Sequence, residues 1–94
     1  MKHIMATVYD SKAAYHMPPF FVKTKNEAIR AFKDAVPDSR SPFHSHPEDF
    51  TLFLVGEFDD STGTITNYDA NVSCGLAIQF KAEAENVVSI QKEA

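Results

Sequence analysis

The sequence lacks tryptophan, and its 94 residues include one cysteine and three glycines. A single cysteine, Cys74, excludes an intramolecular disulfide and with it the disulfide-stapled class of small secreted domains. Because no Cys–His motif accompanies Cys74, we expect it to be a small, buried or half-buried hydrophobe. The three glycines are not clustered, which excludes a glycine-rich phosphate-binding loop.

Long apolar runs are also missing. No stretch approaches the roughly 18 apolar residues of a membrane-spanning helix, and the first residues, Met-Lys-His-Ile, lack the apolar run of a signal peptide. We therefore expect a cytoplasmic protein without membrane contact. Hydrophobic residues make up 44% and charged residues 23% of the chain, which are ordinary globular values. The length predicts a single domain over residues 1–94, with residues 82–94 as an extended or flexible tail.

The net charge of −4 hides an asymmetry between the two halves of the chain. Residues 1–47 carry a net charge of +3, whereas residues 48–94 carry −7. A general nucleic-acid coat is normally basic, because its affinity comes largely from phosphate neutralisation. The whole chain therefore does not fit that class, although a local basic face remains compatible with the sequence.

A strand and a capped helix are the clearest local predictions. Residues 3–9 alternate between apolar and other residues, as in a β-strand, and residues 10–18 then form a loop. Two prolines lead into a short second strand over residues 20–23. Thr24 and Glu27 form a capping box, in which each side chain accepts the backbone N–H of the other residue. Apolar residues at helical spacing follow as far as Pro37, which ends the helix.

The middle of the chain predicts a loop and a hairpin. Residues 37–50 contain three prolines, which exclude regular structure over most of this segment. A polar loop of this length favours a functional role. Residues 51–58 are apolar on both faces, as in a central strand. Residues 59–63, Asp-Asp-Ser-Thr-Gly, predict a tight turn with Gly63 in the left-handed conformation.

The last third predicts more strand. Residues 64–68 form the returning strand of the hairpin, and residues 69–73 form another loop. Leu76, Ile78 and Phe80 then define the inward face of a last strand. Residues 87–90, Val-Val-Ser-Ile, are either a short strand or an exposed tail. Together these elements predict an α+β fold, with one helix packed on a mostly antiparallel sheet of about five strands.

Several segments match the pattern of one phage family. The chain resembles the small non-structural protein of gokushovirus-type microviruses, which are single-stranded DNA phages, from about residue 4 to residue 69. The segments that carry the resemblance are Tyr9-Asp10-Ser11-Lys12-Ala13, Pro18-Pro19-Phe20-Phe21-Val22, Glu27-Ala28-Ile29-Arg30-Ala31-Phe32, Asp34-Ala35-Val36, His46-Pro47-Glu48-Asp49-Phe50-Thr51-Leu52-Phe53 and Gly56-Glu57-Phe58-Asp59-Asp60-Ser61-Thr62. The resemblance implies a DNA-binding accessory factor of genome replication or packaging in the cytoplasm of the infected bacterial host. It implies no catalytic residues and no cofactor.

Two constellations could in principle carry chemistry. His44 and His46 lie two residues apart with Glu48 and Asp49 nearby, a spacing that could hold a metal ion. We interpret this segment instead as a polar loop without a metal. The pair Asp59-Asp60 could act as catalytic carboxylates, but turn residues that bind their own backbone explain it more simply. We therefore expect a protein that is not an enzyme.

The sequence favours two hypotheses for function. In the first, cationic side chains meet the phosphates of single-stranded DNA and exposed aromatic rings meet its bases. The cationic candidates are Lys12, Lys23, Lys25, Arg30, Lys33 and Arg40, and the aromatic candidates are Tyr9, Tyr15, Phe20 and Phe43. In the second, the chain is a homo-oligomeric interaction module that binds a host or viral protein without touching DNA, since its two halves carry opposite charge.

Overall fold

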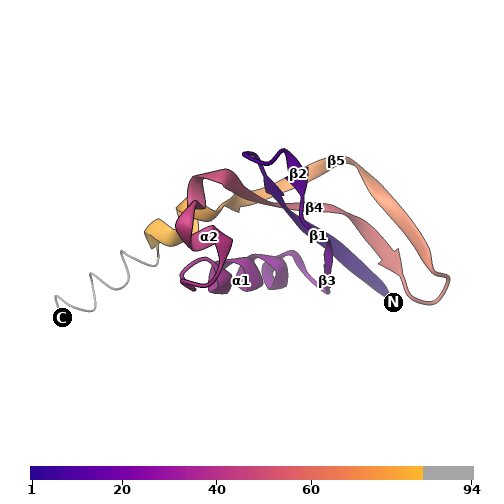
Figure 1. The fold of residues 1–94 in the computed structure, drawn as a ribbon. Helices are drawn as coiled ribbons and strands as arrows, with labels where there is room; N and C mark the ends of the chain where they lie inside the picture. Colours follow the sequence, from indigo (N-terminus) through magenta and orange to yellow (C-terminus); the bar gives the residue numbers. More distant parts are fainter. Residues whose placement is uncertain (84–94) are drawn as a thin grey trace, which may run out of the picture.

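The computed structural model describes residues 1–83. Its centre is a five-stranded antiparallel sheet that is covered on one face by helix α1 (Figure 1). The strands are β1 (Lys2–Asp10), β2 (Tyr15–His16), β3 (Phe20–Val22), β4 (Phe50–Asp59) and β5 (Thr64–Leu76). They lie in the order β2-β1-β4-β5, and β3 pairs with β1 alongside β2. The predicted α+β fold, with its antiparallel sheet of five strands, is confirmed.

Helix α1 (Lys25–Ala35) begins at the predicted cap. The Thr24 hydroxyl accepts the backbone N–H of Glu27 at 3.1 Å, as the capping box requires. The Glu27 carboxylate, however, accepts the N–H of Lys23 at 3.1 Å rather than that of Thr24. Helical geometry extends to the capping residue Val36, whose N–H donates to the Phe32 carbonyl at 3.1 Å, and the helix stops at Pro37, which has no N–H to continue the hydrogen-bond pattern.

The hydrophobic core lies between α1 and the sheet. Phe32 of α1 is at its centre and packs edge-on against Phe43 and Phe80, with ring centroids 5.0 and 5.7 Å apart. Such edge-to-face contacts add to the free energy gained from burial alone. The other buried members of this core are Ala6, Val8, Val22, Ala28, Val36, Phe50, Leu52, Leu54 and Ala77.

Residues 37–50 contain more regular structure than the sequence predicts. Helix α2 (Pro42–Ser45) and the 3₁₀ turn η1 (Pro47–Asp49) lie within this segment. The Ser41 hydroxyl caps α2 by accepting the N–H of Phe43 at 3.0 Å. Both short helices begin with a proline, which is well tolerated there because the first helical residue needs no hydrogen-bond donor. The prediction of an irregular loop was wrong for this reason.

Three other local predictions need correction. The expected loop over residues 69–73 is part of β5, and the expected loop over residues 10–18 contains β2. The predicted last strand is helical over residues 77–83. The Gln79 side chain accepts the Leu76 N–H at 2.9 Å and so caps these helical turns.

The apolar spacing near the end of the chain fits a helix better than a strand. Ala77 and Phe80 face the core three residues apart, whereas Ile78 is 44% exposed. The expected tail lies largely outside the described residues, and the alternatives for residues 87–90 lie there entirely. Among residues 1–83, no helix has the length and apolar character that a membrane crossing needs.

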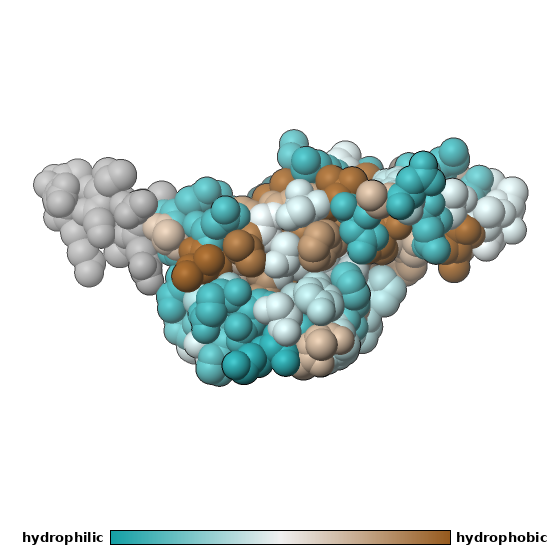
Figure 2. Space-filling view, turned by 90° about the horizontal axis from the view of Figure 1, so that it is seen from above, coloured by the Kyte–Doolittle hydropathy of each residue, from teal (hydrophilic) through white to brown (hydrophobic). Residues whose placement is uncertain are grey.

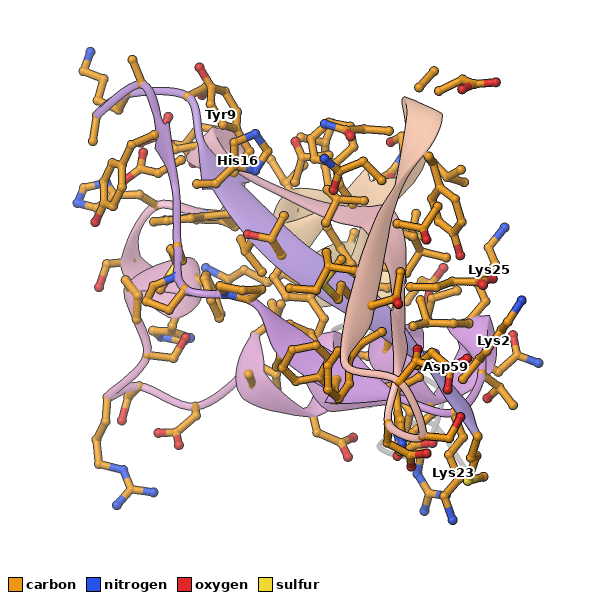
Figure 3. All side chains as sticks on the ribbon, turned by 90° about the vertical axis from the view of Figure 1, so that its right-hand side faces the viewer. Lys2, Tyr9, His16, Lys23, Lys25 and Asp59 are labelled. Carbon is orange, nitrogen blue, oxygen red and sulfur yellow. The ribbon has the colours of Figure 1, made fainter. Side chains whose placement is uncertain are left out.

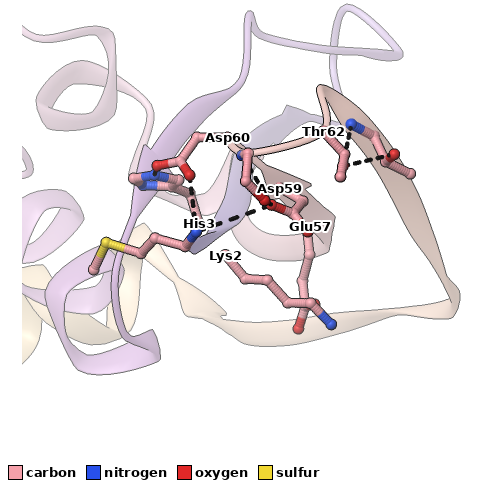
Figure 4. Close-up of polar contacts among 9 residues, drawn as sticks. Lys2, His3, Glu57, Asp59, Asp60 and Thr62 are labelled. Carbon is pink, nitrogen blue, oxygen red and sulfur yellow. Dashed lines mark hydrogen bonds and ion pairs between the residues drawn. The ribbon is translucent and has the colours of Figure 1, made fainter.

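The hairpin turn between β4 and β5 forms as predicted. Gly63 has a φ of +75° and donates its N–H to the Asp59 carbonyl at 2.7 Å. The Asp59 carboxylate accepts the N–H and the hydroxyl of Ser61 at 3.0 and 2.6 Å. Asp60 accepts hydrogen bonds from the Met1 ammonium and from His3 Nε2, both at 2.8 Å (Figure 4). The turn is therefore pinned to the start of β1.

Candidate functional site: an uncharged groove on the open face of the sheet

A bulge divides β5 into two straight parts. Leu54 of β4 pairs with Val72, whereas Gly56 pairs with Asn67, so that residues 68–71 lie opposite Val55 alone. The two strands approach each other closely at Gly56. A Cβ atom there would collide with the Thr66 carbonyl oxygen and lie 3.1 Å from the Asn67 Cα. The extra residues make β5 arch away from the sheet (Figure 1).

The arch of β5 and the segment around β2 enclose a groove on the face of the sheet opposite α1. Figure 3 looks along this groove, with β2 and the labelled Tyr9 and His16 on the left and the arch on the right. Its volume is about 750 Å³, within the range of small-ligand sites. The lining residues carry no formal charge with histidine neutral: Thr7, Tyr15, His16, Met17, Pro18, Pro19, Val55, Asn67, Tyr68 and Asn71.

The wall formed by residues 15–19 is tied to the floor of the groove. The buried Thr7 hydroxyl donates to the Met17 carbonyl at 2.7 Å, and the Met17 N–H donates to the Val8 carbonyl at 2.8 Å. Pro18 and Pro19 follow directly and restrict the backbone of this wall. One side-chain and one backbone hydrogen bond thus fix the position of this wall relative to the floor.

Aromatic rings also lie outside the core, beside the groove. His16 lies between Tyr9 and Phe53, with ring centroids 4.7 and 6.0 Å away. Tyr15, which lines the groove, is 54% exposed. A second pair, Phe21 and Phe58, lies outside the groove with centroids 5.7 Å apart. Figure 2 looks down on this side of the molecule, where hydrophobic patches alternate with polar ones.

The cationic candidates do not gather at the groove. Lys23 and Lys25 flank the cap of α1, on the side of the molecule away from Tyr9 and His16 (Figure 3). Lys12 lies in the turn between β1 and β2, because Asp10 pairs with Tyr15. It lines a separate hollow together with Asp10, Glu48 and Asp49.

The remaining cationic candidates follow α1 and the segment after it. Lys33 forms an ion pair with Glu83 at 3.3 Å, and Arg40 forms one with Asp38 at 3.1 Å. Arg30 is exposed on α1. The structure therefore separates the predicted phosphate contacts from the predicted base contacts.

The four aromatic candidates take different places. Tyr15 lines the groove, and Tyr9 packs on His16, which also lines it. Phe43 instead packs against Phe32 and Phe50 in the core, with its ring centroid 4.9 Å from that of Phe50. Phe20 also packs against the core. The groove residues Asn67, Tyr68 and Asn71 were missed, because their segment was expected to be a short strand and a loop.

The histidine segment is brought together only in part. His46, Glu48 and Asp49 place their potential ligand atoms within 4.8 Å of one another, and they line a hollow of about 590 Å³ together with Asp10 and Lys12. His44 lies on α2, where its carbonyl accepts the Lys81 ammonium at 3.4 Å. Exposed acidic groups commonly cluster without an ion, and the interpretation of this segment as one without a metal stays a prediction.

The pKa values of Asp59, Asp60 and Cys74 are shifted from their ordinary values. Hydrogen bonds from Ser61 lower the pKa of Asp59, and hydrogen bonds from the Met1 ammonium and His3 lower the pKa of Asp60. Both carboxylates therefore remain ionised at neutral pH, where a general acid would need a raised pKa. Burial raises the pKa of the Cys74 thiol, which keeps it protonated and weakly nucleophilic.

Comparison with known proteins identifies the family. The phage ORF5 protein family model matches residues 3–80, which include the sheet, α1 and the whole groove. This chain belongs to the phage ORF5 protein family. The expectation of a phage protein is confirmed at this level. No curated protein and no solved structure shows significant similarity to the chain.

Proposed function

We propose that this member of the phage ORF5 family is a non-enzymatic accessory protein that holds single-stranded DNA during genome replication or packaging. We place it in the cytoplasm of the infected bacterial host, and we propose no cofactor. The observation that carries the proposal is the uncharged groove, in which aromatic rings and amide groups lie together on an open sheet face.

An uncharged groove with aromatic walls favours bases over phosphates. Base–aromatic stacking contributes about 1–3 kcal/mol per base, and Tyr15, an exposed ring, lines the groove. The bases of a duplex are already stacked on one another, so only an unpaired strand presents them to such a groove. We assign the phosphate contact to Lys12, which lies in the turn between β1 and β2.

The direct test is the affinity of labelled single strands and duplexes for wild-type protein and two variants. Tyr15→Ala removes an exposed ring from the groove, so we expect a loss of about 5- to 150-fold in single-strand affinity. Phe21→Ala is the matched control, because it removes an aromatic ring that is 51% exposed but lies outside the groove. Equal losses in both variants would contradict a specific role for the groove.

The salt dependence provides a second measurement on the same proteins. Each phosphate neutralised on a single strand contributes about −0.7 to the slope of log K against log salt. With few cations near the groove, we expect a slope between about −1 and −2. No binding at about 50 mM salt, where phosphate contacts are strongest, would refute the proposal.

The sheet edges favour self-association as a second candidate function. The edge formed by β2 and β3 is protected by short strands and by Pro18-Pro19, whereas β5 is 13 residues long and contains neither proline nor lysine. Natural edge strands usually carry such protection against pairing with another chain. Val72 and Ile65 of β5 are also exposed, at 41% and 62%.

Sedimentation of two lysine variants tests this candidate. If β5 pairs with β5 of another copy, Val72→Lys lowers the sedimenting mass, while Phe21→Lys on the protected edge leaves it unchanged. A monomeric wild-type protein at its highest soluble concentration would exclude self-association. DNA titrations of the same variants show whether the two functions are linked.

A further inference from the structure

The arch of β5 brings two asparagines into the groove. Asn67 is the last residue before the bulge, paired with Gly56, and Asn71 is the last residue of the bulge, before Val72 resumes pairing with Leu54. Both side chains line the groove together with Tyr68, which lies between them in sequence. In a regular antiparallel pair, a single residue of β5 would lie opposite Val55, in place of residues 68–71. The extra residues of the bulge therefore place both amides in the groove.

The two amides are available to a ligand. Each amide offers two donors and one acceptor, and within residues 1–83 neither side chain makes a hydrogen bond to the protein. The Thr7 hydroxyl is already engaged, because it donates to the Met17 carbonyl. Burial, together with the nearby Glu57 carboxylate, raises the pKa of Tyr68.

The opposite wall offers a different kind of contact. Tyr15, His16 and the two prolines contribute rings to this wall, and Val55 on the floor is apolar. A planar molecule with two apolar faces and one polar edge matches this arrangement, with its face against Tyr15 or His16 and its edge toward the amides. An unpaired nucleobase has that shape and chemistry.

We propose that Asn67 and Asn71 determine which base the groove prefers, and that the preferred base is adenine. The proposal rests on the single-strand binding proposed above. An asparagine amide makes two hydrogen bonds to adenine, one donated to N7 and one accepted from N6. At the edge that carries N7, guanine presents two acceptors and thymine lacks N7, so neither base matches the amide there in both hydrogen bonds. Unpaired cytosine, with its N4 donor beside the N3 acceptor, also matches an amide, so the cytosine strand is the main competitor in the test.

The experiment measures the affinity of a thymidine host strand in which three central positions are thymine, adenine, guanine or cytosine. For wild-type protein we expect the adenine strand to bind about tenfold more tightly than the host. In the Asn67→Ala/Asn71→Ala double variant this preference disappears, while the host strand still binds. Tyr15→Ala weakens all four strands by similar factors.

Two controls separate base recognition from folding. Neither asparagine has a positive φ, so alanine fits the backbone at both positions, and thermal melts of the double variant confirm that the fold persists. Asn26→Ala is the matched control, because Asn26 is an exposed asparagine on α1 outside the groove.

The outcomes distinguish this inference from the function on which it rests. Binding of all four strands with equal affinity, or an adenine preference that survives in the double variant, overturns the role of the asparagines alone. A failure of every strand to bind wild-type protein overturns the proposed function together with it. A preference that is lost in the double variant and kept in Asn26→Ala supports the proposal.

Discussion

Replacement of Gly56 by alanine tests the geometry that shapes the groove. The added methyl group would collide with the Thr66 carbonyl oxygen and would lie 2.9 Å from Met5 Cε. Met5 can change its rotamer, but Thr66 contributes backbone, so β5 itself must move. Overpacking of this kind typically costs about 1–3 kcal/mol. In a domain of this size, 1 kcal/mol lowers the melting temperature by about 4–8 °C.

Gly63 is the matched control, because it has space for a side chain but a backbone conformation that disfavours one. A Cβ atom at Gly63 would meet nothing within 4 Å, but the φ of +75° disfavours alanine by about 1 kcal/mol. Asparagine tolerates this conformation, so Gly63→Asn should melt close to wild type. Gly56→Asn should instead melt at or below Gly56→Ala, since its side chain is larger.

Thermal melts followed by circular dichroism measure all four variants. A shift of Asn67 would also change the groove, so Gly56→Ala is expected to reduce any single-strand affinity, whereas Gly63→Ala leaves it unchanged. A melting temperature of Gly56→Ala equal to that of wild type would refute the predicted collision between the added methyl group and the Thr66 carbonyl oxygen. If Gly56→Asn melted above Gly56→Ala, as expected for the corresponding pair at Gly63, the backbone conformation and not the available space would determine the effect at Gly56.

Three further predictions concern the core, the cap and the turn. Phe32→Ala removes the ring at the centre of the core, and urea denaturation should show a loss of about 3–5 kcal/mol; a loss below 1 kcal/mol would contradict its central position. Thr24→Ala should cost about 1 kcal/mol by the same measurement, while Thr24→Ser restores the stability, because the hydroxyl is what caps α1. The pKa of Asp60 is lowered in the folded state, first by the Met1 ammonium and then by His3, so its contribution to stability is present above the unfolded pKa and is lost as the pH falls through the folded value. Asp60→Asn should therefore be less stable than wild type at pH 6 and should converge with it below about pH 4; parallel melting curves throughout would contradict this linkage.

Local signals in the sequence predicted the parts of the fold that depend on neighbouring residues. The Thr24 cap and the Gly63 turn need only side chains and backbone groups within a few positions, and both were found. The end of the sheet was mispredicted, because Leu76, Ile78 and Phe80 alternate as in a strand. The capping contact from Gln79 and the burial of Ala77 show that a helical spacing prevailed.

The groove itself could not be predicted, because its walls lie far apart in the sequence. Residues 15–19 form one wall and residues 67–71 the other. The two walls come together because of the bulge opposite Val55. No pattern of apolar residues in the sequence marks this bulge. Tyr15 was found as an exposed aromatic residue, but exposure alone did not separate it from Phe43, which packs in the core.

The pairing of β1 with β4 has a consequence for the order of folding. Asp10 lies opposite Phe50 at one end of the pairing and Lys2 lies opposite Asp59 at the other, so the two central strands of the sheet are joined by the whole of residues 11–49. Contacts of such long sequence separation slow folding, because the chain loses the entropy of loop closure before the strand pairing stabilises it. During synthesis, β1, β3 and α1 leave the ribosome with no central partner strand to join. The sheet can close only after β4 emerges, and the second wall of the groove follows with β5. A chain interrupted before Asn71 would therefore have only one wall.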